Sequence, residues 1–366
     1  MDAPFNRRSF LASTAAAGLA AGLAPRGALA QDDPLGITLV VPSPVADVGW
    51  SHALAAGLEA VAAEHGDRVK LTVIENIAEG PDADRIMNKT VADGNKFIVA
   101  GSFGYQNGAV QLARRNPDIS VLHASGFMVA PNVTPFAARY YQGTYLMGMA
   151  AAALSKTGKL GSVAAFAIPE LITSINAFVL GAQAVNPDVE VAVVWVNSWF
   201  DPAKEQEAAR ALLAQGCDAI FSNAQDTPSV VSVCEDAGAY VCNLNSSMKK
   251  YAPEKYLGCV ATNWTPFFLN TVKAHLDGGF EGHNAFLGMG DGVVEVLDWS
   301  GDIPADIRER IDASHAAFSS GEAAVFTGPI TRQDGSEGVA EGATMTDEEI
   351  IAMDWHVAGV TTPLPN

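Results

Sequence analysis

The stretch GITLVVPSPVADVGWSHALAAGLEAVAAEHG, residues 36–66, decides the expected fold of this chain. Its apolar start at residues 37–41 predicts a strand, and the apolar positions after Trp50 recur at helical spacing until Gly66. In open α/β sheets, small ligands bind where such a strand passes through a loop into a helix. A flat polar ligand could therefore stack on Trp50 beside Asp47, although an indole that only covers the sheet fits this stretch equally well.

The same alternation of strand and helix continues along the chain. The expected strands after the first are residues 69–77, 97–100 and 119–124, followed, after a helix of small residues at 141–154, by residues 160–166, 189–196, 218–222 and 240–243. Alternation of this kind predicts parallel sheets that are covered by helices on both faces. Two series of similar length predict two lobes with a cleft between their carboxyl edges, and a pair of strands is expected around residues 285–297.

The first thirty residues have the pattern of an export signal. Arg7 and Arg8 precede an Ala-rich apolar run that ends in small residues at positions 28–30, which is typical of the twin-arginine type. Outside this leader no apolar run is long enough to span a bilayer. We therefore expect an exported protein that is soluble in the periplasm after the leader is removed.

The composition excludes some partners. Lys and Arg number 22 against 41 Asp and Glu, which gives a net charge of -19. Because a surface this acidic repels nucleic acid and anionic lipid, we expect neither as a partner. The need for solubility alone also explains the charge.

The common catalytic and metal-binding motifs are missing from the sequence. It contains no GxSxG, HExxH, GxxxxGK[ST] or GxGxxG, and its seven histidines are scattered. The four cysteines, which lack metal-ligand spacing and leave a disulfide open, are Cys217, Cys234, Cys242 and Cys259. We expect no catalytic residue, metal or cofactor, because aromatic rings and uncharged or acidic groups suit holding a small molecule better than transforming it.

Five short motifs together resemble a known family. They are ADVGW at 46–50, GSFG at 101–104, KTGKLG at 156–161, Ala182 with VNP at 185–187, and WFDPAK at 199–204. In this order and behind an export signal, the set is similar to the basic membrane protein family of substrate-binding proteins for ABC importers, which includes purine nucleoside receptors. The resemblance covers nearly all of residues 35–330.

The resemblance implies a type I periplasmic binding fold, in which two Rossmann-like lobes close on a ligand by a hinge. The implied parts are an N-terminal lobe of residues 31–139 plus about 263–284, a C-terminal lobe of residues 140–262 plus about 285–330, and a tail, residues 331–366, that packs on the lobes. Within the tail, Thr346 to Glu349 has the pattern of a helix capping box.

The resemblance also implies where a ligand binds. Family members hold a purine between two aromatic rings, one from each lobe, and by position these rings are Trp50 and Trp199. Phe103 and Phe200 are then expected as cleft walls. The candidate polar partners are Glu170, Asp226 and Asn245, of which the two carboxylates fit helix starts equally well.

Two departures from the family pattern affect the expected ligand. Residues 243–247 lack the aspartate, and residues 259–264 lack the lysine, that meet ribose in nucleoside receptors. A free nucleobase is therefore favoured over a nucleoside. The alternatives are a sugar or nucleoside receptor, for which Arg139 would suit hydroxyl groups, and, less favoured, a periplasmic nucleoside hydrolase. The implied partners are a permease and an ATPase of the inner membrane, and we expect a monomer.

Overall fold

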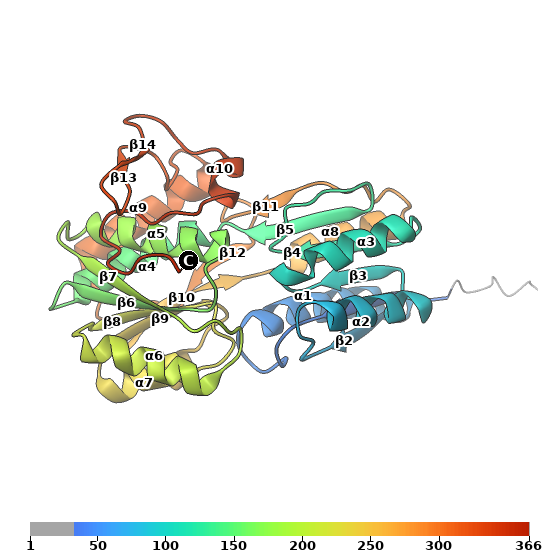
Figure 1. Ribbon diagram of the computed structural model, residues 1–366, viewed down its shortest axis with the longest axis horizontal. Coiled ribbons are helices and arrows are strands. Elements are labelled where there is room, and N and C mark those ends of the chain that lie inside the picture. Colours follow the sequence, from blue (N-terminus) through green and yellow to red (C-terminus); the bar gives the residue numbers. More distant parts are fainter. Residues whose placement is uncertain (1–32, 366) are drawn as a thin grey trace, which may run out of the picture. The chain divides into compact units, whose positions relative to one another are not determined.

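The computed structural model describes residues 33–365, so the expected export signal at residues 1–30 lies outside the described range. From Leu35 onward the chain forms two six-stranded sheets, with the orders β11-β5-β4-β3-β1-β2 and β12-β10-β9-β8-β6-β7 (Figure 1). We call each sheet with its covering helices a lobe. No helix in the described range is long and apolar enough to cross a membrane.

The first lobe is built around a fully parallel sheet. Its strands are β1 (Leu35–Val40), β2 (Val69–Ile74), β3 (Phe97–Ala100), β4 (Ser120–Ala124), β5 (Val133–Ala138) and β11 (Ala285–Leu287), and its helices are α1 (Trp50–His65), α2 (Pro81–Ala92), α3 (Gln106–Arg115) and α8 (Thr265–Leu276). In β1, Leu39 packs into the core that contains Leu54 of α1, whereas Val40 packs into the core that contains Met87 of α2. Successive residues of a strand point to opposite faces, so the sheet is buried on both sides, as the apolar strands predict.

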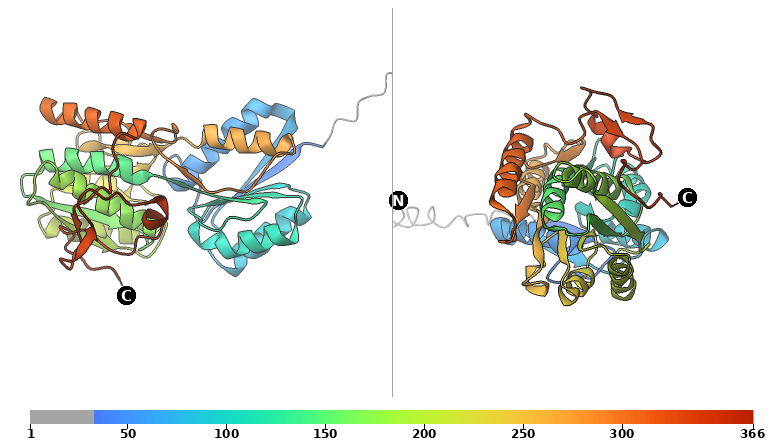
Figure 2. Two further views of the ribbon diagram at one scale, coloured as in Figure 1. Left: turned by 90° about the horizontal axis from the view of Figure 1, so that it is seen from above. Right: turned by 90° about the vertical axis from the view of Figure 1, so that its left-hand side faces the viewer.

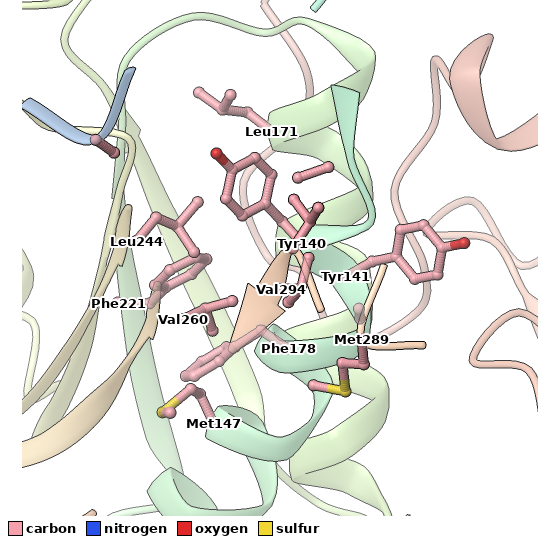
Figure 3. Close-up of a cluster of buried hydrophobic side chains, with 14 of the residues drawn as sticks. Tyr140, Tyr141, Met147, Leu171, Phe178, Phe221, Leu244, Val260, Met289 and Val294 are labelled. Carbon is pink, nitrogen blue, oxygen red and sulfur yellow. The ribbon is translucent and has the colours of Figure 1, made fainter. Parts of the chain in front are cut away.

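The second lobe repeats this plan, except that its edge strand β12 is antiparallel. Its strands are β6 (Lys159–Ala164), β7 (Glu190–Trp195), β8 (Ala219–Asn223), β9 (Tyr240–Asn245), β10 (Tyr256–Thr262) and β12 (Val294–Leu297), and its helices are α4 (Tyr140–Leu154), α5 (Pro169–Gln183), α6 (Pro202–Ala214), α7 (Ser229–Ala237) and α9 (Ala305–Ser320). The rings of Phe178 of α5 and Phe221 of β8 stack at a centroid distance of 5.3 Å, in an apolar cluster that also contains Met147 of α4 (Figure 3). Val163 and Ile220 lie in a separate core with residues of α6 and α7.

The chain crosses between the sheets three times (Figure 1 and Figure 2). The third crossing separates the two strands expected around residues 285–297. β11 pairs in parallel with β5 of the first sheet, whereas β12 pairs antiparallel with β10 of the second sheet. The expected strand pair is therefore wrong, and residues 285–287, which the sequence assigned to the C-terminal lobe, extend the first sheet.

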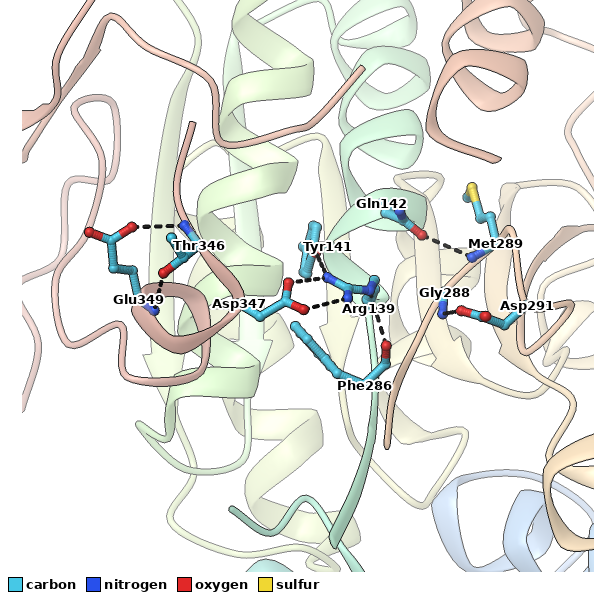
Figure 4. A network of polar contacts seen from close by, with 10 residues as sticks. All are labelled: Arg139, Tyr141, Gln142, Phe286, Gly288, Met289, Asp291, Thr346, Asp347 and Glu349. Atoms are coloured by element: carbon cyan, nitrogen blue, oxygen red, sulfur yellow. Dashed lines mark hydrogen bonds and ion pairs between the residues drawn. The ribbon is translucent and has the colours of Figure 1, made fainter. Parts of the chain in front are cut away.

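Arg139 lies at the first crossing, between β5 and α4, and binds the C-terminal segment. Its guanidinium donates to both carboxylate oxygens of Asp347, at 2.6 and 2.7 Å, and to the carbonyl of Phe286 at 3.2 Å (Figure 4). Asp347 begins α10 (Asp347–Ile351), where the expected capping box between Thr346 and Glu349 is confirmed. Arg139 therefore joins the first crossing to the tail, and it is not among the residues that line the cavity described below.

The remainder of the tail packs on the second lobe. A short hairpin, β13 (Ile330–Thr331) with β14 (Glu337–Val339), precedes α10. After α10 the chain lies on the second lobe (Figure 2). There Asn176 of α5 hydrogen-bonds to the backbone of Trp355 and Val357, and Val360 forms a bridge to Val191 of β7. The four cysteines all lie in the described range, and all four are buried and unpaired.

Candidate functional site

A cavity lies where the carboxyl ends of strands from both sheets meet. The space open to the centre of a water molecule is about 20 Å³. The cavity is lined by Pro42, Trp50, Ser102, Phe103 and Ser125 of the first lobe and by Glu170, Trp199, Ala224 and Asp226 of the second. Five of the eight residues expected to bind a ligand are among them, namely Trp50, Phe103, Glu170, Trp199 and Asp226.

The backbone at these strand ends has an unusual conformation. Ser125 directly follows β4, Ala224 directly follows β8, and Asn197 follows β7 by two residues, and each has a φ between 51° and 62°. Non-glycine residues rarely adopt this left-handed conformation, and it concentrates at functional sites. The turns that it produces lead the chain out of each strand at the edge where the cavity lies.

Trp50 is the first residue of α1, and its ring is held by the first lobe. The indole Nε1 donates to the carbonyl of Gly101 at 2.8 Å, and the ring meets Trp264 edge-on at a centroid distance of 6.5 Å. The ring is half-buried and lines the cavity. Because its hydrogen bond and its edge contact are already made, it can offer a fixed apolar surface to a ligand.

Trp199 comes from the loop after β7 and reaches the opposite lobe. Its ring packs on Phe166 at a centroid distance of 4.8 Å, and its Nε1 donates to Oε1 of Glu79 at 3.3 Å. Glu79 is itself fixed, because it accepts from the Ser102 hydroxyl at 2.5 Å and from the Gly104 amide at 2.9 Å. The second tryptophan is therefore positioned by contacts to both lobes.

Asp226 joins the lobes through its carboxylate. The amide of Trp50 donates to Oδ1 at 2.5 Å, and the hydroxyl of Ser43 donates to Oδ2. The sequence also allowed Asp226 to cap its own helix, but the N-cap residue of α7 is Pro228 and no side chain caps that end. Asp226 instead satisfies an amide at the start of α1 in the other lobe. Burial raises the pKa of Asp226 to about 6, against the opposing effect of the Ser43 hydrogen bond.

Glu170 makes a second polar contact across the cleft. It is the second residue of α5, and its Oε2 accepts from the hydroxyl of Ser125 at 2.9 Å. Burial raises the pKa of Glu170 to about 7, and the hydrogen bond from Ser125 opposes this rise. The group can therefore change its charge near neutral pH while it faces the cavity.

The remaining three of the expected residues lie outside the cavity lining. Asn245 is buried and its Oδ1 accepts from the hydroxyl of Tyr140 at 2.8 Å. Asp47 is exposed and forms an ion pair with Lys250. Phe200 is 40% exposed to solvent. Each of them lies near a strand end, as the sequence predicts. However, Asn245 and Asp47 bind other side chains, and Phe200 faces solvent, so none of the three lines the cavity.

Comparison with known proteins identifies the family. The model of the family described as ABC transporter substrate-binding protein PnrA-like, also called Bmp, matches residues 35–313. The chain belongs to this family. A purine-binding protein of Brucella abortus is 38% identical over 94% of this chain and 98% of its own length. A putative ABC transporter glucose-binding protein of Haloferax volcanii is 31% identical over 85% of this chain and 79% of its own.

Solved structures support the same architecture. A solute-binding protein of an ABC transporter system from Aeropyrum pernix superposes with a TM-score of 0.70 at 18% identity, covering 88% of this chain and 98% of its own. The expected type I binding fold is confirmed, and so is the expected family. Members of the PnrA-like family are substrate-binding proteins of transporters, normally outside the cytoplasm, and not enzymes, which removes the nucleoside hydrolase alternative.

The charges around the cavity of this PnrA-like protein are acidic. Among the residues of the described range that line it, Glu170 and Asp226 are ionisable acids and none is a Lys, Arg or His. Carboxyl groups in a half-buried site attract hydrogen-bond donors and repel anions. A phosphorylated or carboxylated ligand is therefore disfavoured.

Sequence reasoning missed four polar residues of this site. Ser102 and Ser125 line the cavity, Ser43 binds Asp226, and Glu79 binds Trp199. Each of the three serines lies within three residues of the end of β1, β3 or β4, so its position at a strand's carboxyl edge was available from the sequence. Glu79 gave no such indication, because its role depends on a loop of the other lobe.

Proposed function

We propose that this PnrA-like protein is the periplasmic receptor of an ABC importer and that it binds a purine-type ligand between Trp50 and Trp199. The observation that carries the proposal is the cavity itself, which is lined by two tryptophans from opposite lobes and two carboxyl groups. Aromatic faces bind a flat heterocycle, and carboxyl oxygens accept its ring N–H and amino hydrogens. The 38% identical Brucella protein, which is named as purine-binding, supports the same ligand class.

A nucleobase is favoured over a nucleoside. Ribose hydroxyls need several polar partners, and residues 243–247 lack the aspartate of nucleoside receptors. Asn245 at that position already accepts a hydrogen bond from Tyr140. Closure of the two lobes about the crossing segments would trap the base, and a permease and an ATPase of the inner membrane would receive it. The receptor acts as a monomer in this proposal.

A sugar is the second candidate, because the 31% identical Haloferax relative is named as a putative glucose-binding protein. Indole rings also stack on sugar faces. The two ligand classes are separated by mass spectrometry of the small molecules released when the purified protein is denatured. Thermal-shift titration with bases, nucleosides and sugars gives an independent measurement. Stabilisation by sugars with no response to purines would overturn the purine proposal.

The role of Trp199 is tested by Trp199→Ala. Loss of a central stacking residue raises the dissociation constant for the base at least about 30-fold, which corresponds to roughly 2 kcal/mol. Calorimetric titration measures the constant, and circular dichroism reports whether the fold is retained. Trp299→Ala is the matched control, because Trp299 is also half-buried but packs under Arg308, outside the cavity. Unchanged affinity in a folded Trp199→Ala protein would contradict stacking.

A further inference from the structure

A second cavity adjoins the first one on the far side of Glu170. Both cavities are lined by Phe103, Ser125 and Glu170, so these residues form a shared wall. The space open to the centre of a water molecule is about 80 Å³ in the second cavity, against about 20 Å³ in the first. The larger free volume of the site therefore lies beyond Glu170 and not between the tryptophans.

The second cavity has an apolar lining. Its apolar side chains include Phe127, Ile168, Pro169, Phe286, Ile350 and Ile351. Ser125 and Thr173 also line it, but the Ser125 hydroxyl donates to the Glu170 carboxylate at 2.9 Å and the Thr173 hydroxyl to the Glu170 carbonyl at 3.0 Å. Because both hydrogens are used, a sugar would find few donors there, and an anion would face Glu170.

One wall of this cavity comes from the C-terminal segment. Ile350 and Ile351 belong to α10, which lies beyond the residues that the family model matches. The helix is fixed at its start by the capping box and by the bidentate bond between Asp347 and Arg139 (Figure 4). The tail thus adds an apolar wall, held against the join between the lobes, to a cleft otherwise built by the two sheets.

We propose that the second cavity is a subsite for an uncharged alkyl substituent on the ligand and that α10 makes the protein selective for such substituted bases. This inference rests on the proposed purine function. A purine whose exocyclic amine carries one alkyl group keeps an N–H to donate to Glu170 and directs the alkyl group past this residue. The apolar walls then remove that group from water.

The test compares adenine with N6-propyladenine by calorimetric titration of the full-length mature protein. Each buried methylene group strengthens binding about fourfold, so the propyl compound is expected to bind at least about tenfold more tightly than adenine. Ile351→Trp fills the cavity from the tail and is expected to remove this gain, with the adenine constant changed less than about twofold. Ala137→Leu, which fills the cavity from β5, is a second variant in case the first does not fold. Leu297→Trp is the matched control, because Leu297 is 40% exposed and lies on β12, outside the cavity.

Three results would overturn the inference. Adenine binding that equals or exceeds N6-propyladenine binding on the unaltered protein contradicts the subsite and leaves the proposed function standing. A propyl gain that persists in folded Ile351→Trp and Ala137→Leu proteins shows that the substituent lies elsewhere. Failure of both compounds to bind the unaltered protein overturns the subsite, and the purine function falls with it if the other purine bases and nucleosides also fail in the thermal-shift titration.

Discussion

Glu170 and Asp226 carry two carboxyl groups into one cleft, and burial affects both in the same direction. It raises the pKa of Glu170 to about 7 and that of Asp226 to about 6. Each group accepts a hydrogen bond from the opposite lobe, from Ser125 and Ser43 respectively. A carboxyl group with a raised pKa binds a proton more readily in the folded state than in the unfolded state. The free energy of unfolding therefore falls as the pH rises and the group loses its proton.

The replacement Glu170→Gln tests this at the scale of one residue. The folded pKa of about 7 exceeds the ordinary value of 4.5, so the free energy of unfolding of the unaltered protein falls as the pH rises from about 4.5 to 7. Glutamine does not ionise, so the variant does not lose this stability as the pH rises. It is expected to be more stable than the unaltered protein by about 1–3 kcal/mol at pH 8 and to show no such advantage at pH 4. Urea unfolding at both pH values measures the difference.

Glu205→Gln is the matched control for the effect on binding. Burial also raises the pKa of Glu205 to about 7, and this residue lies outside the cavity lining. Its replacement should change the stability profile in the same direction without altering ligand affinity, whereas Glu170→Gln should weaken binding. A constant stability difference between pH 4 and pH 8 for Glu170→Gln would mean that its pKa is not raised.

At the scale of elements, the crossing of α4 and α5 determines where Glu170 lies. The two helices meet at Gly148 and Gly181, where a Cβ on Gly148 would lie 2.0 Å from the carbonyl oxygen of Phe178 and one on Gly181 would lie 1.9 Å from that of Tyr145. These contacts are to backbone atoms, which a side-chain rotation cannot relieve. The helices can approach this closely only because both positions are glycine.

Gly148→Ala is therefore expected to destabilise the protein by roughly 2–4 kcal/mol. Alanine normally stabilises a helix interior relative to glycine, so a loss at this position reports the steric contact and not helix propensity. Gly301→Ala is the control, because its Cβ would meet nothing within 4 Å, and we expect a change below about 0.5 kcal/mol. Denaturant unfolding checks both, and a neutral Gly148→Ala would show that α4 and α5 can separate freely.

The helices and strands were largely predictable from the sequence, because apolar runs and helical spacing are patterns within short stretches of the chain. The same local patterns brought Trp50 and Trp199 to strand ends. The three-residue strand β11 was assigned to the wrong lobe, because so short a run has no period that distinguishes its partner. The bond between Asp226 and the Trp50 amide joins residues 176 positions apart, and it depends on how one lobe faces the other. Nor could the sequence reveal that Tyr140 binds Asn245.

At the scale of the whole molecule, several polar contacts hold the two lobes together over the cleft. They are Ser43 and the Trp50 amide to Asp226, Ser125 to Glu170, Trp199 to Glu79, the Gly49 amide to Ser246, and Lys250 to Asp47. When only the closed form of a protein binds its ligand tightly, the apparent affinity falls by the same factor as the fraction of molecules that can close. A change that holds the lobes apart should therefore weaken binding without unfolding either lobe.

Gly49 precedes α1, and a substitution there would hold the lobes apart through one defined steric contact. Its φ is 95°, and a Cβ there would lie 2.7 Å from Oδ1 and 2.9 Å from Cα of Asp226 in the opposite lobe. Gly80 precedes α2 with a similar φ of 102°, but its Cβ would meet nothing within 4 Å. Alanine at either position costs similar backbone strain. Only Gly49→Ala also obstructs closure.

We expect both variants to lose a similar amount of stability, on the order of 1–3 kcal/mol. Gly49→Ala should also raise the ligand dissociation constant at least about 30-fold and keep a larger radius of gyration in saturating ligand than the unaltered protein. Gly80→Ala should change neither the affinity nor the radius beyond its effect on stability. Calorimetric titration and small-angle X-ray scattering measure the two quantities. If Gly49→Ala binds as tightly as Gly80→Ala, the contact between Asp226 and the start of α1 is not required for closure, because the lobes then close on the ligand through other contacts.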